Sequence, residues 1–146
     1  GELDFRAEVL LIAAARADHV AQVIRPALEA GQHVVCDRYI ASSLAYQGHG
    51  RGLPVAEVAL VNDWGTGGLR PDLTVLIDVP EAVAAERMGT ALDRLEAVGD
   101  GFHQRVAEGY RTLADQDPDG WVVVDGAGTV DEVFTLVLAA VEARLS

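Results

Sequence analysis

The sequence has 146 residues, half of them apolar, and a formal net charge of −12 at pH 7. That length suits one domain, and the acidic balance with singly scattered cations disfavours binding to a nucleic-acid backbone. No apolar run approaches the ~18 residues of a membrane span, and the acidic first residues do not resemble a signal peptide. We therefore expect one cytoplasmic domain that binds neither membranes nor nucleic acid.

The cations are of one kind, because all 11 basic residues are arginines. A planar guanidinium grips phosphate through two parallel hydrogen bonds, so an acidic chain with a few well-placed arginines suits a small phosphorylated ligand. Arginine-only usage can equally reflect the composition of the source genome. The lone Cys36 excludes an intramolecular disulfide and a cysteine-based zinc site.

The first predicted element is a helix, because apolar residues recur at steps of three and four from Phe5 to Ala27. Pro26 should kink the helix or end its regular part, and Gly31 is placed to terminate it. Valine-rich runs without clean alternation predict strands buried on both faces at 33–39, 73–79 and 121–125. Cys36 is then a buried thiol. Further helices are predicted at 53–64, 81–88, 92–113 and 131–145.

Strands that alternate with helices predict a parallel sheet, and such sheets bind ligands beyond the carboxyl ends of their strands. Those ends carry Asp37 with Arg38, then Asp78 and Asp125. An aspartate after a strand is most often a turn residue that bonds its own backbone. We interpret Asp78 and Asp125 in that way and take Asp37 and Arg38 as the candidate site.

The segment 37–54, DRYIASSLAYQGHGRGLP, resembles the signature of the thymidylate kinase family, an Asp-Arg-Tyr followed by a serine-rich helix and Tyr-Gln-Gly-x-Gly-Arg-Gly. The segments LLIAAARADHV (10–20) and NDWGTGGLRPDLTVLIDV (62–79) also match in order and spacing, and so does FHQRVAEGYRTLA (102–114). Several separate motifs that agree are more specific than one short pattern. The resemblance covers essentially the whole chain.

The resemblance implies an α/β fold of the three-layer, P-loop nucleotide-kinase type, a parallel sheet with flanking helices whose first, central strand is missing here. The strands 34–39 and 73–79 would then flank an empty position, roughly 10 Å apart. It also implies one nucleoside monophosphate kinase-like domain over 1–146, truncated at its N-terminus. A homodimer through the long helices, including 5–30, is expected for the complete protein.

The activity implied by the resemblance is transfer of the γ-phosphate of ATP, with Mg²⁺, to dTMP, which gives dTDP. Such transfer needs two polyanions held in line, with their charge neutralised by magnesium and fixed cations. The implied catalytic residues are Asp37, Arg38 and Arg94. Asp37 would act through water or Mg²⁺, and Arg38 would contact the dTMP phosphate.

Side chains from several segments would form the implied substrate site: Ile12, Arg16, Arg38, Ser43, Tyr46, Gln47 and Tyr110. Arg16 and Arg38 would meet the acceptor phosphate, and Tyr110 would pack near the deoxyribose. On the ATP side, the resemblance implies Arg87 and Arg94 at the phosphates and the loop with Gly126 and Ala127 beside adenine. Simpler interpretations stay open for Arg16 as a solvated helix residue and for Tyr46 as a core aromatic.

The sequence departs from the family in several places. It has no Gly-x-x-x-x-Gly-Lys-Ser/Thr loop and no lysine at all, so the chain alone is expected to be inactive. Ile12 stands where the family usually has an aromatic residue, and Ala15 where it has an aspartate. Two alternatives therefore stay open: a non-catalytic kinase-like domain that binds a nucleotide or a partner protein, and a nucleotide kinase for another base.

Overall fold

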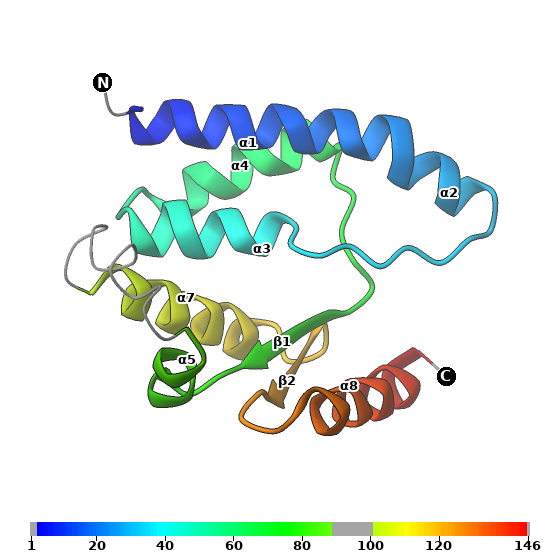
Figure 1. The fold of residues 1–146 in the computed structure, drawn as a ribbon. Helices are drawn as coiled ribbons and strands as arrows, with labels where there is room; N and C mark the ends of the chain where they lie inside the picture. The colour runs from blue at the N-terminus through cyan, green and yellow to red at the C-terminus, as the bar shows by residue number, and fades with distance from the viewer. Residues whose placement is uncertain (1–2, 89–100, 146) are drawn as a thin grey trace. The chain divides into compact units, whose positions relative to one another are not determined.

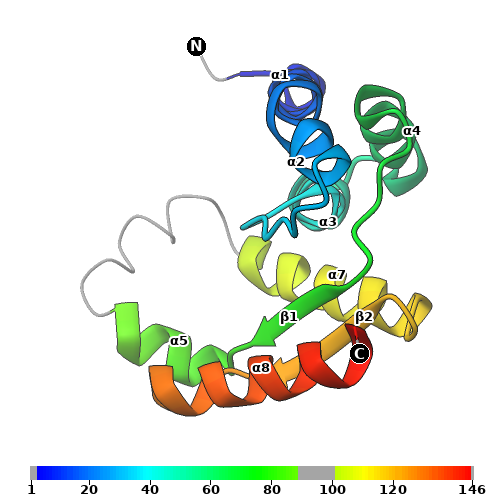
Figure 2. The ribbon, with the colours of Figure 1, turned by 90° about the vertical axis from the view of Figure 1, so that its right-hand side faces the viewer.

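The computed structural model describes residues 3–88 and 101–145, and the chain divides into two units (Figures 1 and 2). The first unit comprises Gly1–Arg70 and Phe102–Tyr110, and the second comprises Pro71–Gly101 and Arg111–Ser146. In the described ranges, no helix combines the length and the apolar character that crossing a bilayer requires.

The first unit begins with one long helical stretch: α1 (Phe5–His19), a π-helical turn η1 (Val20–Ile24) and α2 (Arg25–Glu29). The carboxylate of Asp4 caps its start by accepting from the amides of Arg6 and Ala7. Pro26 lies in the first turn of α2, where its missing N–H costs least. Gly31 ends the stretch at a φ of 75°, as predicted.

Two further helical segments pack beside α1. The short α3 (Ile40–Ser43) continues into a π-helix, η2 (Leu44–Gly50), and α4 (Val55–Thr66) lies along α1 (Figure 1). The start of α7 (Phe102–Gln116) completes the unit. Buried apolar side chains from these elements form the core: Val9, Ala13, Val20, Ile24, Ile40, Ala45, Val58, Phe102 and Val106.

The second unit is built on two parallel strands, β1 (Thr74–Asp78) and β2 (Trp121–Asp125), paired in register from Thr74 with Trp121 to Asp78 with Asp125. The helices are α5 (Glu81–Met88), the end of α7, and α8 (Val130–Leu145), which packs on β2 (Figure 2). Thr129 and Glu132 form the capping box of α8, with Thr129 N donating to Glu132 Oε2 at 2.7 Å. That hydrogen bond lowers the pKa of Glu132.

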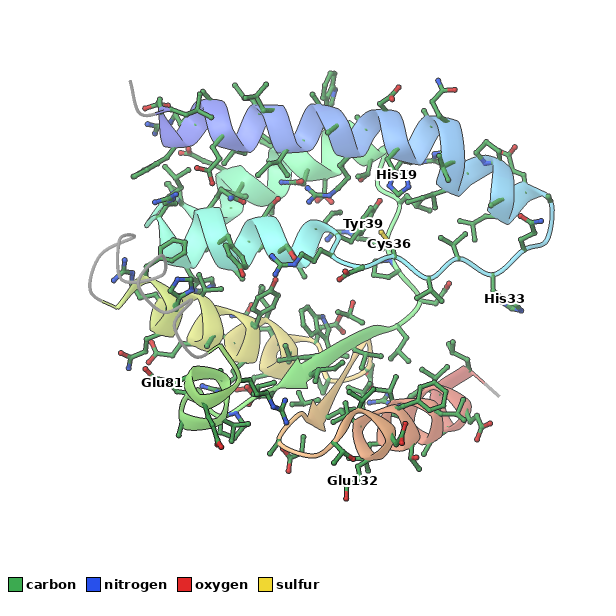
Figure 3. All side chains as sticks on the ribbon, viewed as in Figure 1. His19, His33, Cys36, Tyr39, Glu81 and Glu132 are labelled. Carbon is green, nitrogen blue, oxygen red and sulfur yellow. The ribbon has the colours of Figure 1, made fainter. Side chains whose placement is uncertain are left out.

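The predicted strand at 33–39 is wrong, because this segment is an exposed coil. Val35 is 99% exposed and Cys36 is exposed as well, so the expected buried thiol is also wrong (Figure 3). A strand exists only through hydrogen bonds to a neighbour, and no strand in the described ranges pairs with this segment. Valine content alone therefore did not make a strand, and the empty central position between 34–39 and 73–79 stays a prediction.

The α/β class agrees with the two parallel strands and the helices around them. The helix predicted at 53–64 spans Val55–Thr66, and the one predicted at 92–113 is seen as α7, Phe102–Gln116. Residues 92–100 of that prediction lie outside the described ranges. Periodicity thus found the helices and shifted their ends by a few residues.

Gly50 tests the packing of the first unit, because an added Cβ would lie 2.7 Å from the Phe102 ring and 2.8 Å from Val106. We expect Gly50→Ala to destabilise the chain by about 1–3 kcal/mol, the usual cost of overpacking. Gly65→Ala is the matched control and should not destabilise the chain, since its Cβ would meet nothing closer than 3.4 Å, an ordinary contact distance. Urea unfolding measures the free energy of unfolding of both variants. Equal values for Gly50→Ala and Gly65→Ala would contradict this packing.

Candidate functional site

Arg16 ties three segments of the first unit together. Its Nη1 donates to the Ser43 hydroxyl at 3.0 Å and to Oδ1 of Asn62, and its Nη2 donates to the backbone carbonyl of Tyr39 at 3.0 Å. Burial lowers the pKa of Arg16, so these acceptors compensate a guanidinium that has lost part of its water. Arg16 is therefore not a solvated helix residue.

Asn62 is a partner of the predicted site residue Arg16 that the sequence interpretation missed. It is 1% exposed, and its Nδ2 donates to the carbonyl of Val58 at 2.8 Å. Val58, Asn62 and Thr66 recur every four residues on the buried face of α4, each at most 2% exposed. Two polar residues on an otherwise apolar helical face were the available indication of a buried polar contact.

A cluster of aromatic side chains surrounds Tyr46 on η2. Its ring centroid lies 6.0 Å from that of Phe102 and 6.3 Å from that of Tyr110, both in edge-on geometry. The Tyr110 hydroxyl is 2.8 Å from the Ser42 hydroxyl, and burial raises the pKa of Tyr110. Tyr46 and Tyr110 were predicted as substrate-binding residues from two distant segments of the sequence, and the fold brings their rings together.

Arg38 lies against this cluster, with its guanidinium carbon 5.1 Å from the Tyr46 ring centroid. Interaction with the Tyr46 side chain raises the pKa of Arg38. Its backbone adopts a φ of 65°, a left-handed conformation that costs energy in a non-glycine residue and is found disproportionately at functional sites. Asp37 beside it is exposed.

Arg38 differs from Arg16 in what its donors bind. Arg16 spends three of its five donors on protein acceptors. Within the described part of the chain, the guanidinium of Arg38 forms no ion pair and no hydrogen bond to a backbone carbonyl; it interacts chiefly with the Tyr46 side chain and more weakly with the neighbouring Asp37. An exposed cation stacked on an aromatic ring can still bind an anion from solution.

Gln47 has a more structural role than predicted. Gln47 is buried and donates to Oε1 of Glu8 at 2.7 Å, while Glu8 also pairs with Arg51 at 3.5 Å. Gln47 thus joins η2 to α1. Ile12 is half-buried on α1.

In the second unit, Arg87 is fixed to the loop after β2. It donates to the carbonyls of Gly126, Ala127 and Gly128 at 2.9, 2.8 and 2.7 Å. Of the residues predicted for the ATP side, Arg87, Gly126 and Ala127 therefore come together, with Arg87 as a clamp on the loop. Arg87 and Gly126 border an apolar hollow of about 560 Å³ lined in part by Ile77, Val79, Phe134 and Val137. Arg94 lies outside the described residues.

The two strand-end aspartates behave differently. Asp125 accepts from the amide of Ala127 at 2.9 Å, which confirms it as a turn residue. Asp78 instead receives two hydrogen bonds from Arg111, at 2.9 and 2.8 Å, so its interpretation as a turn residue is wrong. The two-pronged guanidinium of Arg111, 33 residues away in the sequence, binds this carboxylate instead.

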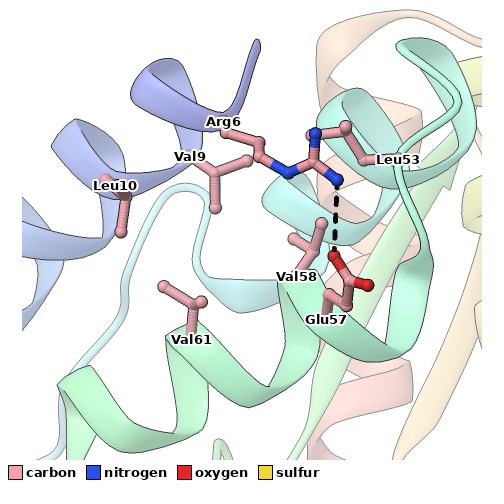
Figure 4. A pocket seen from close by; sticks show the side chains of 7 residues that line it. All are labelled: Arg6, Val9, Leu10, Leu53, Glu57, Val58 and Val61. Atoms are coloured by element: carbon pink, nitrogen blue, oxygen red, sulfur yellow. Dashed lines mark ion pairs between the residues drawn. The ribbon is translucent and has the colours of Figure 1, made fainter.

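A second, smaller hollow of about 150 Å³ lies between α1 and α4 (Figure 4). Its lining is mainly aliphatic: Val9, Leu10, Leu53, Val58 and Val61. An ion pair of 3.9 Å between the exposed Arg6 and Glu57 crosses it. None of the predicted site residues lines it. Among the described residues, no group of three or more His, Cys, Asp or Glu side chains could hold a metal ion.

Comparison with known proteins gives a consistent result. Residues 1–137 match the family model for thymidylate kinase. The chain is 44% identical to a thymidylate kinase of Desulfovibrio desulfuricans over 99% of its own length and 71% of that protein. It is 46% identical to one of Leifsonia xyli subsp. xyli over 99% of its length and 70% of that protein. For one of Geotalea uraniireducens the identity is 43%, over 95% of the chain and 69% of that protein.

The Arg87 clamp predicts a local loss of protection. Arg87→Met removes the donors to the 126–128 carbonyls, so we expect faster amide hydrogen exchange at 126–129. Arg144→Met is the matched control, because Arg144 binds the carbonyls of Pro118, Asp119 and Trp121 at the other end of β2. It should quicken exchange around that turn and leave 126–129 unchanged. Unaltered exchange at 126–129 in Arg87→Met would show that the clamp does not order the loop.

Proposed function

Because the chain belongs to the thymidylate kinase family, we propose that it serves the transfer of the ATP γ-phosphate to dTMP and that its first unit binds dTMP. One observation carries the placement of the acceptor: Arg38 lies against the Tyr46 ring without an ion pair or a hydrogen bond to a backbone carbonyl in the described ranges, and Tyr110 lies beside Tyr46. A cation and aromatic rings in one cluster suit a ligand with a phosphate and a base.

On the acceptor phosphate, we assign the direct contact to Arg38. Its planar fork can hold two phosphate oxygens at once, which orients the phosphate for in-line attack. Arg16 uses three donors inside the protein and keeps two for a ligand. It therefore offers fewer hydrogen-bond donors to the phosphate than Arg38 does, and it orders the segment that carries Arg38.

For the base and the sugar, we assign Tyr46, Ser43 and Tyr110, with Ile12 as an apolar contact. Ser43 is 1% exposed and accepts from Arg16, so its observed contact orders Arg16, and its place at the nucleotide is assigned on the family resemblance alone. Gln47 donates to Glu8 and so holds η2 against α1. These assignments follow the proposed acceptor position.

For the donor, we assign the hollow of the second unit to the adenine of ATP, bordered by Arg87 and the loop with Gly126 and Ala127. An apolar hollow edged by fixed polar groups is the usual form of a base-binding site. Arg94 is assigned to the ATP phosphates on the family resemblance alone.

Mg²⁺ would be held by the nucleotide phosphates and, through water, by Asp37. Magnesium commonly uses one or two carboxylates together with substrate phosphates, and the exposed Asp37 carboxylate next to Arg38 fits that arrangement. When bound, the ion neutralises charge on the transferred phosphoryl group. The chain's own part is to hold the acceptor phosphate and orient it.

Turnover also needs a phosphate-binding loop with a lysine, and these 146 residues contain no lysine. The dTMP contacts proposed for the first unit do not include that loop. Binding is therefore the sharper test of the acceptor site, and dTDP formation tests the loop.

We further propose that both units belong to one cytoplasmic kinase domain and that the protein forms a homodimer through its long helices. Exposed apolar side chains on α1 and α4 support the dimer: Leu10 is 58%, Leu11 62%, Leu60 70% and Trp64 86% exposed. Apolar surface of this extent on two helices favours a covered face.

Arg38→Ala tests the phosphate contact. We expect it to weaken dTMP binding roughly tenfold or more, since a hydrogen bond to a charged group is worth about 1.5–3 kcal/mol, reduced here by solvent exposure. Arg38→Lys should recover only part of the affinity, because an ammonium cannot make the two-pronged contact. Isothermal titration calorimetry measures the dTMP affinity of the unaltered chain and of both variants.

Two controls sharpen this experiment. Thymidine lacks the phosphate, so its affinity should change little in Arg38→Ala. Arg70→Ala removes another exposed arginine of the first unit, one that pairs with Asp63, and should leave dTMP binding unchanged. An unchanged dTMP affinity in Arg38→Ala would remove Arg38 from the site.

A further inference from the structure

Asn62 holds its amide in one orientation. Its Nδ2 donates to the Val58 carbonyl at 2.8 Å, one turn back on α4, and its Oδ1 accepts from Nη1 of Arg16. A flipped amide would set oxygen against the carbonyl and the amide hydrogens against the guanidinium. The helix backbone therefore aims the Asn62 oxygen at Arg16.

A buried amide needs a reason to be kept. Asn62 is 1% exposed on a face of α4 that is otherwise suited to an aliphatic side chain, and burying a polar group without partners costs roughly 1–3 kcal/mol. Leucine has a similar volume and would pack there without that cost. What leucine cannot do is accept a hydrogen bond from Arg16.

The same guanidinium reaches the segment that carries the proposed acceptor site. From Arg16, Nη1 also donates to Ser43 at 3.0 Å, and Nη2 donates to the Tyr39 carbonyl at 3.0 Å. Tyr39 directly follows Arg38, whose φ is 65°. The position of Arg16 thus bears on both ends of α3, one residue from the strained Arg38.

We propose that Asn62 is a positioning residue for acceptor binding: it fixes the Arg16 guanidinium, which in turn holds Ser43 and the Arg38–Tyr39 backbone in the geometry that binds dTMP. This inference rests on the proposed function of the first unit. Asn62 itself does not touch the nucleotide.

The test compares dTMP affinity in Asn62→Leu and Asn62→Asp by calorimetry. Asp keeps an oxygen for Arg16, whereas Leu keeps only the volume. We expect Leu to weaken dTMP binding roughly tenfold, within the range of coupling between residues in contact, and Asp to bind dTMP more tightly than Leu. A packing role predicts the reverse order, because Leu suits a buried site better than a carboxylate does.

A double-mutant cycle with Arg16→Met separates this role from a general effect on stability. If Asn62 acts through Arg16, adding Asn62→Leu to Arg16→Met should not lower the affinity further. Val58→Ala, a buried apolar truncation one turn back on α4 that keeps the backbone carbonyl used by Asn62, should lower stability and leave dTMP binding unchanged. Thermal melts show whether each protein is folded. If Asn62→Leu does not fold, the cycle is measured with Asn62→Asp and Arg16→Met instead.

Each result decides the matter. Asp tighter than Leu, with no further loss in the Arg16→Met background, supports the proposal. Equal affinity in Asn62→Leu and the unaltered chain, Leu tighter than Asp, or additive losses in the cycle would overturn it. Failure of the unaltered chain to bind dTMP would instead refute the proposed function, and with it this inference.

Discussion

A half-buried guanidinium in the first unit has to find its hydrogen-bond acceptors inside the protein, and the site is arranged around that requirement. Arg16 finds them on three segments: the Tyr39 carbonyl before α3, the Ser43 hydroxyl within it, and the Asn62 amide on α4. Leaving any of these donors unpaired would cost more than one ordinary hydrogen bond contributes. The segment that follows Arg38 is therefore fixed from α1 and α4.

Several of the arginines share one structural use. Besides Arg16, several arginines donate to backbone carbonyls at the ends of helices and strands, often to two or three at once: Arg25, Arg87, Arg105 and Arg144. A forked guanidinium suits this task, whereas an ammonium acts as a point charge. The composition suggested phosphate binding for the arginines in general. In the structure most of them hold the fold, and Arg38 is set apart by its exposed position on the Tyr46 ring.

Local sequence patterns predicted what local physics decides. Helical periodicity, the Thr129–Glu132 capping box and the Gly31 terminus are confirmed, since each depends on residues a few positions apart. The strand at 33–39 failed because pairing depends on a neighbour that composition does not reveal. The Asp78–Arg111 pair and the Arg16–Asn62 contact join residues more than 30 positions apart, so no spacing rule could find them. The family motifs grouped Arg16 with Ser43, Arg38 with Tyr46, and Arg87 with the loop at 126–127, and in the structure the members of each group are in contact.

The central claim is that the first unit holds dTMP at Arg38 and Tyr46. The most direct measurement is a titration of the ¹⁵N-labelled chain with dTMP, followed by amide and arginine Nε shifts in two-dimensional NMR. The account predicts that the largest shifts fall on Arg38, on the amides of α3 and η2, and on Arg16 Nε, with smaller ones at 126–129 of the second unit. Shifts centred on 126–129, or none at millimolar dTMP, would contradict it.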